Sequence, residues 1–280
     1  MTIPKKVERR ISQAFLKLRP LLEEAKKRDV NEADTVTLVK AVLSDAFGWD
    51  PFFEVTSEFA IRSTYVDLAV QTDNQVVYLI EVKAIGSDLR DNHLRQAVNY
   101  AANHGVDWVV LTNGAVWQAF RVTFGKPIGH ELVFDLDLLS ANPKDARVRE
   151  TAFLLSKEGM TKSAITQFHA EKQAMSRFNV AAIIRSDAVM SVVRRELKRA
   201  FPMLKPTIDQ VRELVEAEVL KREVVEGDKA MKAERSMKKV NRPLRQKRPA
   251  ARRSKLDGGG ATTKAPAGGG GPGSATVADA

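Results

Sequence analysis

The residues of this sequence best suited to chemistry are an aspartate and, after thirteen intervening residues, a Glu-x-Lys triplet: Asp67 and Glu81-Val82-Lys83. If residues 65–71 and 76–83 pair as a hairpin around Asn74, Asp67 lies directly opposite Glu81, with Cβ atoms about 5 Å apart. Because side chains alternate along a strand, Lys83 shares the face of Glu81. The spacing therefore predicts two carboxylates and an ammonium converging on one spot.

Facing carboxylates of this kind favour a divalent cation, because a bound positive charge removes their mutual repulsion. Hard oxygen ligands indicate Mg²⁺ or Mn²⁺ rather than zinc. Such an ion would hold a scissile phosphate and polarise the attacking water. The ammonium of Lys83 would orient that water or offset the developing charge.

The surrounding pattern predicts an α/β fold. Amphipathic helical structure is expected over 7–28, with Pro20 as a break or the start of a new helix, and a further helix begins at the N-cap Asn31 and ends near Gly48. Strands follow over 55–62, 65–71 and 76–83, the last of them apolar on both faces and therefore expected at the centre of the sheet. A helix over 88–103 and a hairpin over 108–122, turning at Asn113-Gly114, complete the core.

The acidic and basic residues of this core resemble the PD-(D/E)XK nuclease signature, and their surroundings resemble the N-terminal nuclease domain of type I restriction enzyme R subunits. The resemblance extends from about Asn31 to Phe120. Besides the triad, its features are the helix opening Asn31-Glu32-Ala33-Asp34-Thr35, the helix end Phe47-Gly48-Trp49-Asp50, Glu58 in the first strand, Gln96 with Tyr100 on the next helix, and the hairpin Leu111–Trp117.

This resemblance implies a restriction-endonuclease-like core, with a mixed central sheet flanked by helices, and a Mg²⁺-dependent endonuclease that hydrolyses phosphodiester bonds of nucleic acid, DNA being the favoured substrate. It implies catalytic roles for Asp67, Glu81 and Lys83, and metal ligation by Asp67, Glu81 and Val82. It further implies that Glu32 is a helix-borne acid near the metal and that Gln96 contacts the scissile phosphate. R subunits continue into an ATPase motor, but the phosphate-binding pattern G-x-x-x-x-G-K-[ST] does not occur in this sequence, so we expect a stand-alone nuclease-like domain.

Charge and composition divide the chain into three parts. We expect an α/β domain over 1–142, a helical module over 143–228 that is a candidate contact for a protein partner, and a disordered tail over 229–280 that is basic and then rich in Gly, Ala and Pro. The net charge is +10, but residues 229–256 alone carry +11, so attraction to a phosphate backbone is expected mainly from the tail. The absence of cysteine and of a long apolar stretch favours a cytoplasmic protein without a membrane span.

A purely structural role remains open for each candidate residue. Asp67 and Glu81 are also compatible with solvated strand-end acids, and Lys83 with an exposed lysine. Glu32 would favour the first turn of any helix, and Gln96 would suit a helix surface. For the whole protein, the alternative is a non-catalytic nucleic-acid-binding or adaptor protein on a nuclease-like fold.

Overall fold

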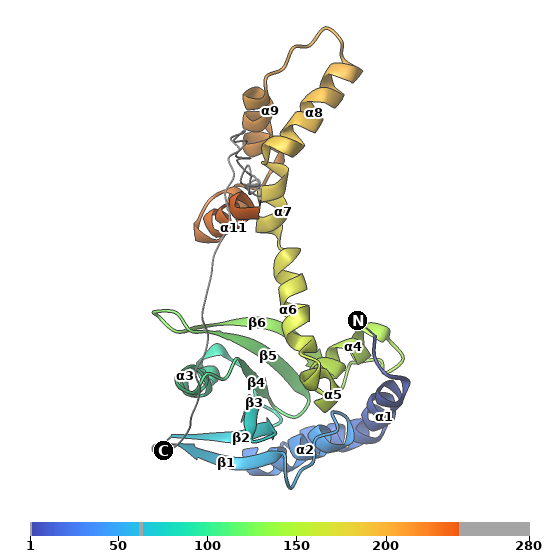
Figure 1. The fold of residues 1–280 in the computed structure, drawn as a ribbon. Helices are drawn as coiled ribbons and strands as arrows, with labels where there is room; N and C mark the ends of the chain where they lie inside the picture. The colour runs from blue at the N-terminus through green and yellow to red at the C-terminus, as the bar shows by residue number, and fades with distance from the viewer. Residues whose placement is uncertain (1, 62–63, 241–280) are drawn as a thin grey trace, which may run out of the picture. The chain divides into compact units, whose positions relative to one another are not determined.

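In the computed structural model, which describes residues 2–61 and 64–240, six strands form one mixed sheet in the chain order β1-β2-β3-β4-β5-β6 (Figure 1). For residues 58–61, 64, 65 and 240 only the backbone is described. Neighbouring strands run antiparallel except for β3 and β4, which are parallel. The strands are β1 (Val55–Ile61), β2 (Thr64–Thr72), β3 (Gln75–Val82), β4 (Trp108–Thr112), β5 (Val116–Thr123) and β6 (Gly129–Asp137).

Two helices at the N-terminus cover one face of the sheet. Helix α1 (Lys5–Lys27) buries an apolar stripe and continues through Pro20, so the break expected there is wrong. Helix α2 (Glu32–Asp45) follows the N-cap Asn31, whose side chain accepts a hydrogen bond from the Asp34 N–H at 2.9 Å, so the predicted N-cap is confirmed. Both helices pack with the strand residues Tyr78, Ile80 and Val82 in one apolar cluster.

The opposite face is covered by a 3₁₀ turn, η1 (Asp91–Leu94), and helix α3 (Arg95–His104), which connect β3 to β4. Leu94, Ala97 and Ala101 form a second cluster with Leu79 and Leu111. Strand β3 is therefore buried on both faces, which confirms its predicted central position (Figure 1).

Strand β6 was not expected from the sequence. Its buried residues Val133, Phe134 and Leu136 pack under the helices that follow, whereas Leu132 on the same strand is exposed. A strand whose apolar residues include an exposed one gives a weak alternating signal, and this explains why the pattern missed it.

The helical region that we expected from residue 143 begins with helices that pack against the sheet. The Trp49 indole and the Tyr78 hydroxyl both donate to the carbonyl oxygen of Leu155, at 2.8 and 3.1 Å, and Phe153 is buried in the first core cluster. These helices are α4 (Ala146–Leu155), α5 (Lys157–Thr161) and α6 (Ala164–Ala174).

Beyond them the chain forms short helices that are held largely by ion pairs. Arg185 contacts Glu216 at 2.6 Å, and Arg177 contacts Glu223 at 2.7 Å. The elements are α7 (Arg177–Ile184), α8 (Asp187–Ala200), α9 (Ile208–Leu214), the π-helical turn η2 (Val215–Val219), α10 (Arg222–Val225) and α11 (Asp228–Val240).

The start of the tail differs from the expectation. We expected disorder from residue 229, but residues up to Val240 continue α11, because Ala230 and Ala233 are buried there. The rest of the expected tail, 241–280, lies outside the described residues. Within the described part of the chain, no helix is both long and apolar enough to span a membrane.

Candidate active site

The hairpin of β2 and β3 brings Asp67 into register with Glu81. Leu68 pairs with Ile80 and Ala69 with Leu79, and the same register carried one residue further sets Asp67 beside Glu81. The turn itself consists of Asp73 and Asn74, both with positive φ (50° and 61°), and a β-bulge between Val70 and Gln71 shifts the register by one residue. Without that bulge Asp67 would face Ile80, and the side chains of Asp67 and Glu81 would lie on opposite faces of the sheet.

At the end of β3, direct contacts connect three charged side chains, and the fourth, that of Asp67, binds the main chain beside them. The carboxylate of Asp67 accepts a hydrogen bond from the Val82 N–H at 2.7 Å. The ammonium of Lys83 lies 2.9 Å from Glu81 Oε1 and 3.3 Å from Glu32 Oε2. Glu32 is the first residue of α2, so a helix on one face of the sheet and a hairpin within it supply side chains to the same cluster.

The main chain fixes the place of Lys83. Its N–H donates to the Thr112 carbonyl at 2.8 Å, which extends the parallel pairing of β3 and β4 one residue beyond the strand. The side chains of Glu81 and Lys83 are largely buried, at 13% and 19% exposure, whereas Glu32 is half exposed.

The electrostatics of the cluster are set by three carboxylates around one ammonium. Burial raises the pKa of Asp67, and Glu32 adds to this, against the Val82 hydrogen bond and Lys83, which lower it. Burial likewise raises the pKa of Glu81, helped by Asp67 and opposed by its hydrogen bond with Lys83. Burial lowers the pKa of Lys83, but Glu81 and the other two carboxylates outweigh it, so that pKa is raised. With every group ionised the cluster carries an excess of two negative charges, which favours binding of a cation.

The carboxylates and the neighbouring carbonyl suit a hard divalent cation. Among the described residues no three His, Cys, Asp or Glu side chains are arranged to hold a metal ion, and the ligand set predicted from the sequence uses only two, Asp67 and Glu81, with the carbonyl of Val82. One oxygen of Asp67 is occupied by the Val82 N–H, which orients the carboxylate toward the end of β3. Carboxylate and carbonyl oxygens are ligands that Mg²⁺ and Mn²⁺ accept, so the residues fit the ion.

Comparison with protein families gives a match that includes the hairpin. Residues 52–133 match the family of the type I restriction enzyme R protein N terminus. The predicted resemblance is thus confirmed over this segment, which contains Asp67, Glu81, Lys83 and Gln96 but not Glu32. Comparison with curated proteins and with solved structures gives no match.

Two further residues of the restriction-subunit resemblance, Gln96 and Glu58, lie on α3 and β1. Gln96 lies in the first turn of α3, which covers the sheet face that carries Leu79 and Leu111, and its predicted role at the phosphate stays a prediction. Glu58 occupies the β1 position beside Asp67, because Ser57 pairs with Leu68 and Phe59 with Val66, but its side chain lies outside the described residues.

One residue of the restriction-subunit segment was missed as a positioning group. The amide of Asn113 donates to the carbonyls of Ile85 and Ser87, at 3.3 and 3.0 Å, and its oxygen accepts from the Ala115 and Val116 N–H groups. It thereby ties the segment after Lys83 to the β4–β5 loop. Its sequence signal, Asn followed by Gly, predicted only a two-residue turn, whereas the loop spans Asn113–Ala115.

Proposed function

We propose that this protein is a metal-dependent endonuclease of the PD-(D/E)XK type, with a restriction-endonuclease-like core, that hydrolyses phosphodiester bonds of DNA. The observation that carries the proposal is the contact network of Asp67, Glu81 and Lys83 within the segment that matches the restriction enzyme R family. A mixed sheet with helices on both faces supports the fold assignment.

Each residue of the cluster has a role in this proposal. Asp67, Glu81 and the Val82 carbonyl would hold Mg²⁺ or Mn²⁺, which when bound supplies Lewis-acid polarisation of the phosphate and a more acidic water. Lys83, 2.9 Å from Glu81, is held where its ammonium can donate to the attacking water or to a phosphate oxygen. Glu32 restrains Lys83 from the side of α2, and Gln96 would donate to the phosphate.

The test is cleavage of single- and double-stranded DNA and RNA with Mg²⁺ or Mn²⁺. We expect wild type to cleave DNA, and Asp67→Asn, Glu81→Gln and Lys83→Met each to lose at least a hundredfold in rate. Glu171→Gln is the matched control, because Glu171 is exposed on α6 and lies outside the carboxylate cluster. Cleavage that persists in Glu81→Gln would identify a contaminating nuclease and reject the assignment.

The second candidate is a nucleic-acid-binding or adaptor protein without cleavage. The concentration of twelve Lys and Arg residues in 229–256 favours it, because such a block supplies attraction that needs no active site. Binding of DNA by wild type and Glu81→Gln alike, with no cleavage under either metal, would support this candidate. A protein partner could bind the exposed apolar side chains between α8 and α9, which are Phe201, Met203 and Leu204.

A further inference from the structure

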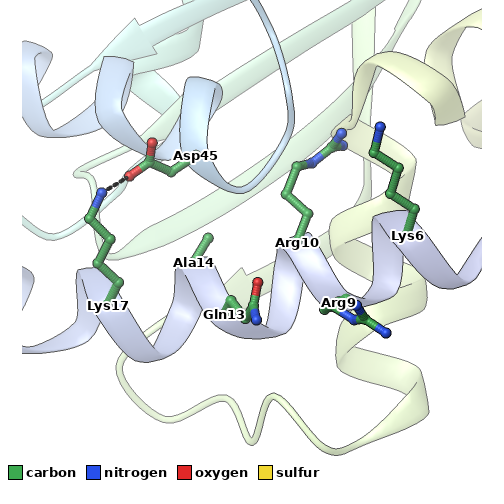
Figure 2. A pocket seen from close by; sticks show the side chains of 7 residues that line it. All are labelled: Lys6, Arg9, Arg10, Gln13, Ala14, Lys17 and Asp45. Atoms are coloured by element: carbon green, nitrogen blue, oxygen red, sulfur yellow. Dashed lines mark hydrogen bonds and ion pairs between the residues drawn. The ribbon is translucent and has the colours of Figure 1, made fainter.

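A second charged region lies on the first two helices, at a distance from the carboxylate cluster. The N-terminal half of α1 and the last residue of α2 line a cavity of about 400 Å³ (Figure 2). Its polar lining consists of four cations, one amide and one acid: Lys6, Arg9, Arg10, Lys17, Gln13 and Asp45.

Two of the four cations are already held by acids. Lys17 forms an ion pair with Asp45 at 2.7 Å, drawn as a dashed line in Figure 2. Arg10 binds both oxygens of Glu158 at 2.7 Å and also donates to the Phe47 carbonyl. These two cations therefore stabilise the joint between α1, α2 and α5, and they are not free to bind a ligand strongly.

The other two cations have no such partner within the described ranges. Lys6 and Arg9 are exposed, and neither forms a hydrogen bond or ion pair with a described residue. Figure 2 shows Lys6 extending to the same side of α1 as Arg10, one turn away. Like charges three and four residues apart on a helix repel each other, and an anion in the cavity would remove that repulsion.

The position of the cavity relative to Lys83 limits the kind of anion. Glu32, which contacts Lys83, is the first residue of α2, and Asp45, which lines the cavity, is the last. The fourteen residues of α2 set Glu32 about 20 Å from Asp45, and Arg9 and Lys6 lie about two to three turns before Lys17, the partner of Asp45, on α1. A polyanion such as a duplex can span a separation of this size, whereas a single phosphate cannot.

We propose that this cavity binds a backbone phosphate of double-stranded DNA through Lys6 and Arg9, with Gln13 as an additional donor. The site is a positioning contact: it holds the duplex at a point remote from the proposed scissile phosphate and carries no sequence information. The inference shares with the proposed function only the premise that the protein meets DNA, since binding here needs neither a metal ion nor cleavage.

The experiment measures binding of a 16-base-pair duplex to the full chain in EDTA, by fluorescence anisotropy, between 50 and 200 mM salt. The test variant is Lys6→Gln with Arg9→Gln, which leaves Arg10 and Lys17 in their structural ion pairs. The matched control is Lys26→Gln with Lys27→Gln, which removes the same charge from exposed positions near the other end of α1. Unchanged thermal unfolding midpoints verify that both variants fold.

We expect the test variant to bind roughly tenfold more weakly at 100 mM salt, with a salt slope smaller by up to about two, and the control to change less than about twofold. Acetylation mapped by mass spectrometry adds a local measurement: duplex should protect Lys6 and leave Lys205 reactive. Because cleavage is absent in EDTA, these results would stand even if wild type proved to cleave nothing with Mg²⁺.

Three results would overturn the proposal. Equal losses in the two double variants would show diffuse attraction rather than a site. Acetylation of Lys6 at the same rate with and without duplex would exclude contact. Protection of Lys6 by millimolar inorganic phosphate but not by duplex would assign the cavity to a free phosphate ligand instead.

Discussion

Replacing Lys83 by methionine tests the electrostatic description of the candidate site without relying on cleavage. The substitution keeps an unbranched side chain of similar length but removes the ammonium 2.9 Å from Glu81. Asp67 and Glu81 then remain half-buried beside each other without a cation, so their pKa values, already raised by burial, should rise further.

The magnitude follows from two opposing effects. At 2.9 Å and an effective dielectric constant of about 20, the attraction between Lys83 and Glu81 is about 6 kcal/mol. Burial of the ammonium, the largest influence on its pKa, offsets much of this. A net loss of about 2 kcal/mol is expected at pH 8, the usual range for a hydrogen bond between charged groups.

The sign of the pH dependence is determined by the raised pKa values. A carboxyl whose pKa rises on folding stabilises the folded state fully below its ordinary pKa, 3.8 for Asp67 and 4.5 for Glu81, and this contribution is lost as pH rises through the folded-state pKa. In Lys83→Met a larger fraction of the two acids is therefore protonated at pH 4.5 than at pH 8, so less attraction to the missing ammonium is lost at the lower pH. The loss of stability relative to wild type should fall below about 1 kcal/mol at pH 4.5.

The assay is urea unfolding of wild type and variant at both pH values, with Lys205→Met as a control for removal of an exposed lysine. A loss that is the same at pH 4.5 and pH 8 would refute the reasoning, because it would show that the cost arises from packing. A variant as stable as wild type at pH 8 would refute it as well, because the acids would then not depend on Lys83.

Three other predictions concern the elements that position the site. Asn113→Ala leaves the carbonyls of Ile85 and Ser87 without a donor and should destabilise the protein by about 2 kcal/mol in urea unfolding, while hydrogen exchange rises in 84–88. Glu158→Gln should lower the free energy of unfolding by about 1 kcal/mol at neutral pH and by little at pH 3. Burial raises the pKa of Glu158, but Arg10 lowers it by more, so the pKa is below its ordinary value and the stabilisation is lost as pH falls. Deleting Val77, the extra residue of the bulge, leaves Asp67 opposite Glu81 in a regular ladder, so Mg²⁺ binding measured by calorimetry without DNA should persist, whereas deleting Val77 together with Leu79 should slip the register and abolish it.

The hairpin shows how far the sequence determines the site. The pairing of Asp67 with Glu81 was inferred from a turn centred on Asn74, and the register next to Ala69 and Leu79 agrees with it. The turn is nevertheless at Asp73-Asn74, and the agreement arises because the bulge restores the register. A bulge of one valine in an apolar run has no sequence signal, since its position depends on packing of both faces.

Local sequence patterns could not predict contacts between distant segments, for a different reason. An acid in the first turn of a helix is favoured by the helix dipole whatever lies nearby, so the local pattern gave no indication that Glu32 contacts a lysine fifty-one residues away at 3.3 Å, and only the family resemblance suggested a place near the site. Asn113 likewise matched a turn signal, although its amide binds two carbonyls beyond β3. Both side chains acquire their partners only when the sheet and helices are assembled.

The cluster around Lys83 therefore depends on three backbone features that belong to different parts of the fold. The bulge sets which residue of β3 faces Asp67, the hydrogen bond from the Lys83 N–H to Thr112 fixes where β3 ends, and the Asn31 cap fixes the first turn of α2, where Glu32 lies. These features do not make burial of the two acids favourable. The raised pKa values of Asp67 and Glu81 show that burial of the ionised carboxylates is unfavourable. A fold that holds two unfavourably buried acids beside one lysine keeps an arrangement that a bound cation would stabilise, and this is the physical reason to look for metal binding there first.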